Sequence, residues 1–176
     1  MITDQNYLAW QKKLENHSLF RWFLVFFGLY SIILVYVAGI FLVVDRKFQE
    51  LFLVAAAFVL ARLVISPLIF LFYKKQRPYQ KLNFIPPNSL WLFSGTTSRN
   101  NSFPSDHAAS FAAITLSLFW FYPLFGFILF PIAILNGVAR VMLGYHHISD
   151  ILAGWLMGAF AGWVVITWLT TMLFTH

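Results

Sequence analysis

The sequence predicts an all-α integral membrane protein: a helical bundle of about five transmembrane helices, preceded by an N-terminal amphipathic helix. Apolar residues make up 60% of the 176 residues and charged residues only 10%, which is typical of membrane spans and not of a soluble domain. The apolar residues also gather in runs that reach the ~20 residues a helix needs to cross a bilayer. The length suits one domain, so we treat residues 1–176 as a single membrane domain.

Residues 1–18 are predicted to form an interfacial helix that lies on the membrane surface. Trp10 and Leu14 recur at helical spacing, and Lys12 and Lys13 lie between them. An apolar face beside a basic face is the pattern of helices that lie in the membrane interface.

The rest of the bundle, residues 20–174, is divided into five apolar stretches. Short charged or proline-containing turns separate most of them, and one long connection covers residues 78–104. Loops of this length inside a compact domain usually carry function or move, so we expect this loop on the side of the candidate site. The expected spans are residues 20–44, 48–73, 105–122, 125–143 and 148–174.

Glycine recurs every four residues in the last expected span, at Gly154, Gly158 and Gly162. Small residues at this spacing let two helices approach closely within a membrane. The stripe predicts either close packing within one chain or the face of a homodimer, so a monomer and a homodimer both stay open.

Composition excludes several kinds of chemistry. The chain has no cysteine, so disulfides, thiolate catalysis and cysteine-based metal sites are excluded. The acidic residues form no cluster for Mg²⁺ or Ca²⁺, so we expect no metal and no cofactor. The net charge of +6 comes from basic residues that flank apolar spans; they suit anionic lipid headgroups and argue against nucleic acid as a partner. The acidic residues are Asp4, Glu15, Asp45, Glu50, Asp106 and Asp150.

The most informative stretch joins the last two expected spans, where Arg140, His146, His147 and Asp150 interrupt almost wholly apolar sequence. Charged groups at a membrane edge are costly and mark candidate functional sites. If a helix starts here, His146 and Asp150 share one face. The carboxylate can then hold one imidazole N–H and leave the other nitrogen as a nucleophile or base. His147 is the alternative base, and Arg140 offers a fixed fork for phosphate.

Two further polar stretches are expected beside this one. Residues 103–107 (Phe-Pro-Ser-Asp-His) open the third span, and residues 74–78 (Lys-Lys-Gln-Arg-Pro) follow the second. Because successive spans cross the membrane in alternating directions, all three stretches fall on the same side. The sequence thus predicts that they meet in one site.

Together, the three stretches resemble the motifs of the type 2 phosphatidic-acid phosphatase superfamily of membrane lipid phosphatases. That family reads Lys, six residues, Arg-Pro; then Pro-Ser-Gly-His; then Ser-Arg, five residues, His, three residues, Asp. The same order recurs here over about residues 62–160. The departures are Phe70 in the place of the lysine, Asp106 in the place of the glycine and Ala139 in the place of the second serine.

The resemblance implies catalytic roles for three residues. His146 would attack phosphorus and form a phosphohistidine, and Asp150 would orient its ring. His107 would protonate the leaving oxygen and then activate water for the second step. General acid–base work of this kind needs two histidines in opposite protonation states.

The resemblance also implies a set of phosphate-binding residues. Arg77 and Arg140 would neutralise the phosphate oxygens, and the Ser105 hydroxyl would add a donor. The family lysine is missing at its usual spacing, so Lys74 or Lys75 is expected to replace it.

Two further candidate site residues each have more than one possible role. Arg62 falls near the middle of the second span, where it either binds a neighbouring helix or contacts the substrate. Asp106 either caps the third helix, or orients a basic group and tunes His107.

The Phe-Pro-Ser-Asp-His form is similar to that of bacterial undecaprenyl-diphosphate phosphatases of the bacitracin-resistance type, which implies a polyprenyl diphosphate substrate. Phosphatidylglycerophosphate and phosphatidic acid are alternative substrates, and a non-catalytic lipid-phosphate-binding protein or transporter is the alternative of another class. The family implies a site on the outward face of the inner (cell) membrane. The distribution of lysine and arginine would instead place the site in the cytoplasm by the positive-inside rule.

Overall fold

All regular secondary structure in the described part of the chain is helical, which confirms the predicted fold class. The computed structural model describes residues 4–31, 33–35, 37, 48–86 and 101–174. Three helical rods are long and apolar enough to cross a membrane, with 25, 20 and 21 residues. The protein is therefore an all-α integral membrane protein. The rods are Phe48–Phe72, Pro123–Met142 and Ile148–Trp168.

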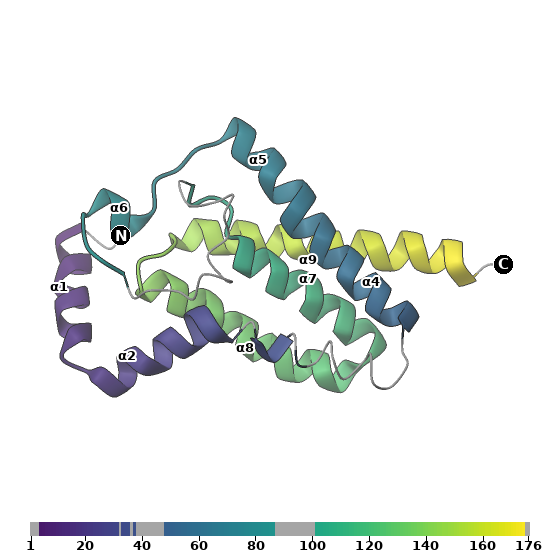
Figure 1. The fold of residues 1–176 in the computed structure, drawn as a ribbon, viewed down its shortest axis with the longest axis horizontal. Coiled ribbons are helices and arrows are strands. Elements are labelled where there is room, and N and C mark those ends of the chain that lie inside the picture. The colour runs from purple at the N-terminus through teal and green to yellow at the C-terminus, as the bar shows by residue number, and fades with distance from the viewer. Residues whose placement is uncertain (1–3, 32, 36, 38–47, 87–100, 175–176) are drawn as a thin grey trace.

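Helix α7 (Asp106–Phe121) lies at the centre of the bundle (Figure 1). It packs against α4 (Phe48–Val59), α8 (Pro123–Met142) and α9 (Ile148–Phe174). The start of α7, the end of α8 and the start of α9 lie toward the same end of the bundle in Figure 1. The candidate site residues lie at that end.

The first long rod continues α4 through a π-helical turn, η2 (Leu60–Ile65), into α5 (Ser66–Phe72). Pro67 lies at the start of α5, where its missing N–H and its ring would disturb a regular α-helix. The wider turn just before it accommodates this loss, as π-bulges commonly do. The helical structure therefore continues past Pro67 to Phe72.

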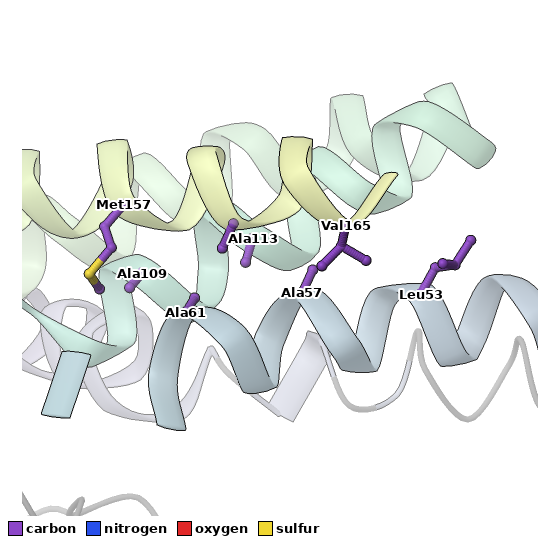
Figure 2. Packing of buried hydrophobic residues seen from close by; sticks show 8 residues of the cluster. Leu53, Ala57, Ala61, Ala109, Ala113, Met157 and Val165 are labelled. Atoms are coloured by element: carbon purple, nitrogen blue, oxygen red, sulfur yellow. The ribbon is translucent and has the colours of Figure 1, made fainter. Parts of the chain in front are cut away.

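The glycine stripe of α9 packs against other helices of the same chain. Of the two predicted uses of the stripe, packing within one chain is therefore the one observed. A Cβ atom added at Gly158 would lie 2.1 Å from the carbonyl oxygen of Ala109, and one at Gly154 would lie 2.6 Å from that of Ser105. Buried apolar residues of α4, η2, α7 and α9, most of them alanine, fill the adjoining interface (Figure 2). That cluster contains Leu53, Ala57, Ala61, Ala109, Ala113, Met157, Ala161 and Val165.

The predicted amphipathic helix is present as α1 (Asp4–Glu15), and it stands across the end of the bundle in Figure 1. The Tyr7 hydroxyl donates to the carbonyl of Val141 at 2.8 Å, and Nε2 of Gln11 donates to that of Met142 at 2.7 Å. These carbonyls belong to the last turn of α8, beyond the reach of the regular intrahelical hydrogen bonds. The Val141 carbonyl also accepts the N–H of Gly144 at 3.0 Å. The polar side chains of α1 therefore cap α8, a role beyond that of a surface anchor.

The helix boundaries follow the predicted spans closely. Helix α8 begins at Pro123, two residues before the predicted span, because proline is suited to the first turn of a helix. The predicted first span begins as α2 (Ser18–Val25) and η1 (Phe26–Tyr30); its residues 38–44 lie outside the described part. The long loop begins with the short helix α6 (Pro78–Lys81), and its residues 87–100 also lie outside the described part.

Replacing Gly158 by alanine should destabilise the bundle, because the new methyl group would meet the Ala109 carbonyl and push α9 from α7. Overpacking of this kind costs ~1–3 kcal/mol. Gly162→Ala is the matched control, since its Cβ would lie 3.1 Å from the nearest atom, the Ala113 carbonyl oxygen. Thermal unfolding in detergent should give the lower melting temperature for Gly158→Ala. Equal melting temperatures for the two variants would contradict the packing.

Candidate active site

Backbone hydrogen bonds join the three polar stretches at one end of the bundle. The N–H of Ser102 donates to the carbonyl of Lys75 at 2.7 Å, and the N–H of Ser105 donates to that of Asp150 at 3.0 Å. The prediction that the three stretches meet is therefore confirmed. The site residues buried there are Arg77, Ser105, Asp106, His107, Arg140, His146 and Asp150.

The ring of His146 is held in one tautomer. Its Nδ1 lies 2.8 Å from the carbonyl oxygen of Ser102, and because a carbonyl only accepts, Nδ1 must carry the proton. In the neutral ring, Nε2 then holds a lone pair, and Nη2 of Arg140 lies 3.4 Å from it. A lone pair on nitrogen beside a guanidinium is suited to attack an anionic phosphate.

The surroundings of His146 keep its ring neutral. Burial lowers the pKa of His146 well below its ordinary value of 6.5, and the positive charges of Arg140 and Arg77 lower it further. The hydrogen bond to the Ser102 carbonyl opposes these effects only in part. His146 is therefore unprotonated near neutral pH, as a nucleophile must be.

The direct hydrogen bond predicted between Asp150 and His146 is not formed. Oδ2 of Asp150 lies 3.9 Å from Nδ1 of His146. His146 precedes the first residue of α9, so the two residues do not share a helix face. Instead, Oδ2 of Asp150 accepts the N–H of His147 at 2.9 Å, as a carboxylate in the first helical turn does in a capping box. Asp150 also accepts the hydroxyl of Ser102.

The ring of His147 contacts the segment that follows α5. Its Nε2 lies 3.2 Å from the carbonyl oxygen of Gln76, while its backbone N–H is bound to Asp150. The geometry therefore favours His146 over His147 as the nucleophile.

Arg140 is anchored by the π-helical turn η1. Its Nη1 donates to the carbonyl of Gly28 at 2.8 Å, and Nδ2 of Asn136 donates to the neighbouring carbonyl of Phe27, also at 2.8 Å. A π turn widens the helix and changes which carbonyls are bonded within it. Nε of Arg140 is buried and makes no hydrogen bond within the described residues. A bound anion would supply the missing acceptor.

The first turn of α7 brings a hydroxyl and an imidazole to the same place. Ser105 is the N-cap residue, and its oxygen accepts the N–H of Ala108 at 3.4 Å. Among the described residues, no acceptor takes its hydroxyl proton, which can therefore be donated to a ligand. His107 is only 6% exposed and interacts electrostatically with Arg140 and Arg77. Arginine side chains and the N-terminus of α7 thus create a positive environment that suits an anion.

The two lysines proposed to replace the missing family lysine take different places. Nζ of Lys75 donates to Oδ1 of Asp150 at 2.6 Å and to the hydroxyl of Ser149 at 2.8 Å. Lys74 is exposed and makes no side-chain hydrogen bond or ion pair with the described residues. The lysine that reaches the site is therefore bound to a carboxylate.

Asp106 does not cap α7, because Ser105 occupies that position. The Asp106 carboxylate accepts the hydroxyl of Ser66 and so ties α5 to the start of α7. Nη1 of Arg62 lies 3.4 Å from the hydroxyl of Ser110. This bond from η2 to α7 supports the reading in which Arg62 binds a neighbouring helix.

Sequence reasoning missed Asn101 and Ser102. Oδ1 of Asn101 accepts the N–H of Lys75 at 2.8 Å, and its Nδ2 donates to the carbonyl of Tyr73 at 2.8 Å. Ser102 contacts both His146 and Asp150. Their only signal in the sequence was a pair of polar residues directly before the Phe103-Pro104 motif.

The assembled groups are suited to bind and transfer a phosphoryl group. Arg140, Arg77 and the Ser105 hydroxyl can stabilise negative charge, and His146 can attack. Within the described residues, no group of three or more histidine, aspartate or glutamate side chains is placed to hold a metal ion.

Comparisons with known proteins agree with this chemistry. The model of the PAP2 superfamily matches residues 51–173. A curated protein from Bacillus licheniformis, the bacitracin transport permease protein BcrC, is 32% identical over 77 residues, which are 44% of this chain. The match spans only 38% of that relative's length.

A solved structure shares the fold. It is a transmembrane PAP2 type phosphatidylglycerolphosphate phosphatase from Bacillus subtilis, with a TM-score of 0.61 and 23% sequence identity. The likeness covers 87% of this chain and 76% of the other. At this identity it shows the fold alone.

The free energy of unfolding should fall as the pH is lowered below about 6.5, the ordinary pKa of histidine. The unfolded chain binds a proton at His146 there, whereas the folded chain, with its lowered pKa, does not. The contribution reaches ~1.4 kcal/mol per pH unit. Melting temperatures from about pH 7 to pH 5 should fall less in His146→Asn, which cannot be protonated. The same slope in both proteins would contradict the lowered pKa.

Proposed function

Because the chain belongs to the PAP2 superfamily, we propose that it is a membrane lipid phosphatase that hydrolyses a polyprenyl diphosphate, undecaprenyl diphosphate, to the monophosphate. The observation that carries this function is the placement of the His146 ring, whose Nδ1 contacts the Ser102 carbonyl at 2.8 Å and whose Nε2 lies 3.4 Å from Nη2 of Arg140. This pair provides a nucleophile and a positive charge at the point where a phosphate would react.

Two lines of support bear on the substrate. The Phe-Pro-Ser-Asp-His motif resembles that of undecaprenyl-diphosphate phosphatases of the bacitracin-resistance type, and the curated relative has a name that refers to bacitracin transport. The structural neighbour is a phosphatidylglycerolphosphate phosphatase, so its lipid and phosphatidic acid are the alternative substrates for this chain.

The proposed reaction has two displacement steps. In the first, Nε2 of His146 forms a bond to the terminal phosphorus, and the bond from phosphorus to the bridging oxygen breaks. His107 gives its proton to that oxygen, so the lipid monophosphate leaves. In the second, His107 takes a proton from water, whose oxygen attacks phosphorus. The phosphorus–nitrogen bond then breaks, which releases inorganic phosphate and restores His146.

Positive charge stabilises the phosphoryl group during both steps. Arg140 and Arg77 bind its oxygens, and the Ser105 hydroxyl donates a further hydrogen bond. In phosphoryl transfer, positioning and charge stabilisation supply most of the rate enhancement. Oδ2 of Asp150 lies 3.9 Å from Nδ1 of His146. Asp150 therefore acts on the ring electrostatically and through Ser102, which contacts both residues.

The alternative of another class is a non-catalytic membrane protein that binds or transports a lipid phosphate. Phe70 and Ala139 depart from the family pattern, and a binding protein would tolerate such departures. The His146 tautomer favours the enzyme, because binding alone does not require a neutral nucleophile. We further propose that the protein resides in the inner membrane with its site facing outward, as the family resemblance implies.

Purified protein in detergent should release inorganic phosphate from undecaprenyl diphosphate faster than from phosphatidylglycerophosphate or phosphatidic acid. Release should persist in chelator, because the proposed reaction uses histidine and arginine in place of a metal ion. Phosphate assays over this lipid panel, with and without chelator, measure both properties. Preference for a monophosphate lipid would reassign the substrate, and failure to cleave any lipid phosphate would favour the binding protein.

The nucleophile should be identified by trapping the phosphoenzyme. With labelled substrate and an alkaline quench, at which phosphohistidine survives, wild-type protein should carry label and His146→Ala should carry none. His107→Ala should accumulate label when the leaving group needs no proton, because water activation then limits turnover. General acid–base groups contribute ~10²–10⁴-fold, so its steady-state turnover should fall by that order.

His147→Ala is the matched control for His146→Ala, since the two residues are neighbours and His147 contacts a backbone carbonyl outside the reacting centre. Its turnover should stay within about tenfold of wild type, a change of ~1.4 kcal/mol or less in the barrier. Label retained in His146→Ala and lost in His147→Ala would show that the nucleophile is His147.

A further inference from the structure

Ser102 uses all of its polar groups within the network around His146. Its N–H donates to the carbonyl of Lys75 at 2.7 Å. Its carbonyl oxygen lies 2.8 Å from Nδ1 of His146, and its hydroxyl donates to Oδ2 of Asp150. The residue is 0% exposed. One residue outside the three motifs therefore links the imidazole to the carboxylate.

Lys75 neutralises that carboxylate from the other side. The Asp150 side chain is 0% exposed, and its Oδ1 lies 2.6 Å from Nζ of Lys75. A buried carboxylate needs such a partner, because an unpaired charge away from water is strongly unfavourable. The ammonium also donates to Ser149 at 2.8 Å, so two of its three donors are used within the protein. Lys75 is thus placed to fix the position of the Asp150 carboxylate.

We propose that Ser102 and Lys75 are positioning residues of the reaction. Ser102 fixes the tautomer and orientation of the His146 ring and couples the ring to Asp150, and Lys75 holds Asp150 in place. The inference rests on the proposed phosphatase function. It also assigns Lys75 a role different from that of a phosphate ligand.

The two roles of Lys75 predict different kinetics. A phosphate ligand that binds substrate and transition state alike raises KM when it is removed and leaves kcat unchanged. A residue that positions the nucleophile lowers kcat with little effect on KM, because it acts on the chemical step. Separate values of kcat and KM therefore distinguish the roles.

The first variant is Ser102→Ala, which keeps the carbonyl that binds His146 and removes the hydroxyl that binds Asp150. Its kcat should fall about 10- to 100-fold, the effect of losing a hydrogen bond to a charged group. Its KM should stay within about threefold of wild type. Ser117→Ala is the matched control, because Ser117 is also 0% exposed and its hydroxyl donates only to the Ala113 carbonyl, at 2.8 Å, within α7. The control should keep the wild-type kcat.

The second variant is Lys75→Met, with the exposed Lys13→Met as control. Without Lys75, the negative charge of Asp150 is no longer offset near His146. A proton on His146 is then favoured, so the acid limb of the kcat/KM profile should move to higher pH. A merely structural role would lower the amount of folded protein and leave the limb in place. Among the described residues, the charged or titratable groups that interact with His146 are Arg77, Arg140, His107, His147 and Asp150.

The experiment measures kcat, KM and the pH profile on the lipid phosphate that wild-type protein cleaves best. The proposal is supported by a lower kcat in both variants, a shifted acid limb in Lys75→Met and unchanged controls. It is overturned if Ser102→Ala keeps the wild-type kcat, or if Lys75→Met raises KM alone. A wild-type protein that releases no phosphate from any lipid overturns the proposed function itself, which is a separate outcome.

Discussion

A fully buried carboxylate is the constraint on which the site depends. Asp150 is 0% exposed and accepts hydrogen bonds from Lys75, Ser102 and the backbone of His147. These donors come from three segments that are far apart in the sequence: the segment after α5, the segment before α7 and the start of α9. Because each lost partner would leave buried charge unsatisfied, the carboxylate holds the three segments together. The same arrangement presents the His146 ring toward Arg140.

Close helix packing makes this arrangement geometrically accessible. Gly154 lets the carbonyl of Ser105 approach α9 so closely that a Cβ would lie 2.6 Å from it. The first turn of α7, with Ser105 and His107, therefore lies beside Asp150. Buried alanine residues of α4, η2, α7 and α9 extend the same close contact through the bundle. The apolar packing and the polar site are thus parts of one structure, since widening the helix interface would separate the reacting groups.

The charge balance of the site suits a neutral nucleophile in a positive environment. Arg77 and Arg140 are both buried, and their charges help to keep His146 unprotonated. Arg140 is oriented by the Gly28 carbonyl of η1, so the first helical segment contributes to the site although it contains none of the motifs. A bound phosphate group would supply the negative charge that balances these two guanidinium groups. This fits the chemistry expected of the PAP2 superfamily.

Hydropathy and motif order were enough to predict the fold class and to predict that Arg77, His107 and His146 meet at one end of the bundle. Hydropathy and alternating topology are properties of the chain taken in order, so they need no tertiary information. Which groups bond to one another could be learned only from the folded molecule: Ser102, not Asp150, holds the His146 ring. The capping of α8 by α1 could not be predicted either, because it depends on which side chains the packing brings to the last carbonyls of α8. Hydrogen bonds between segments far apart in the sequence follow from the distances that packing creates, and side-chain type alone does not contain those distances.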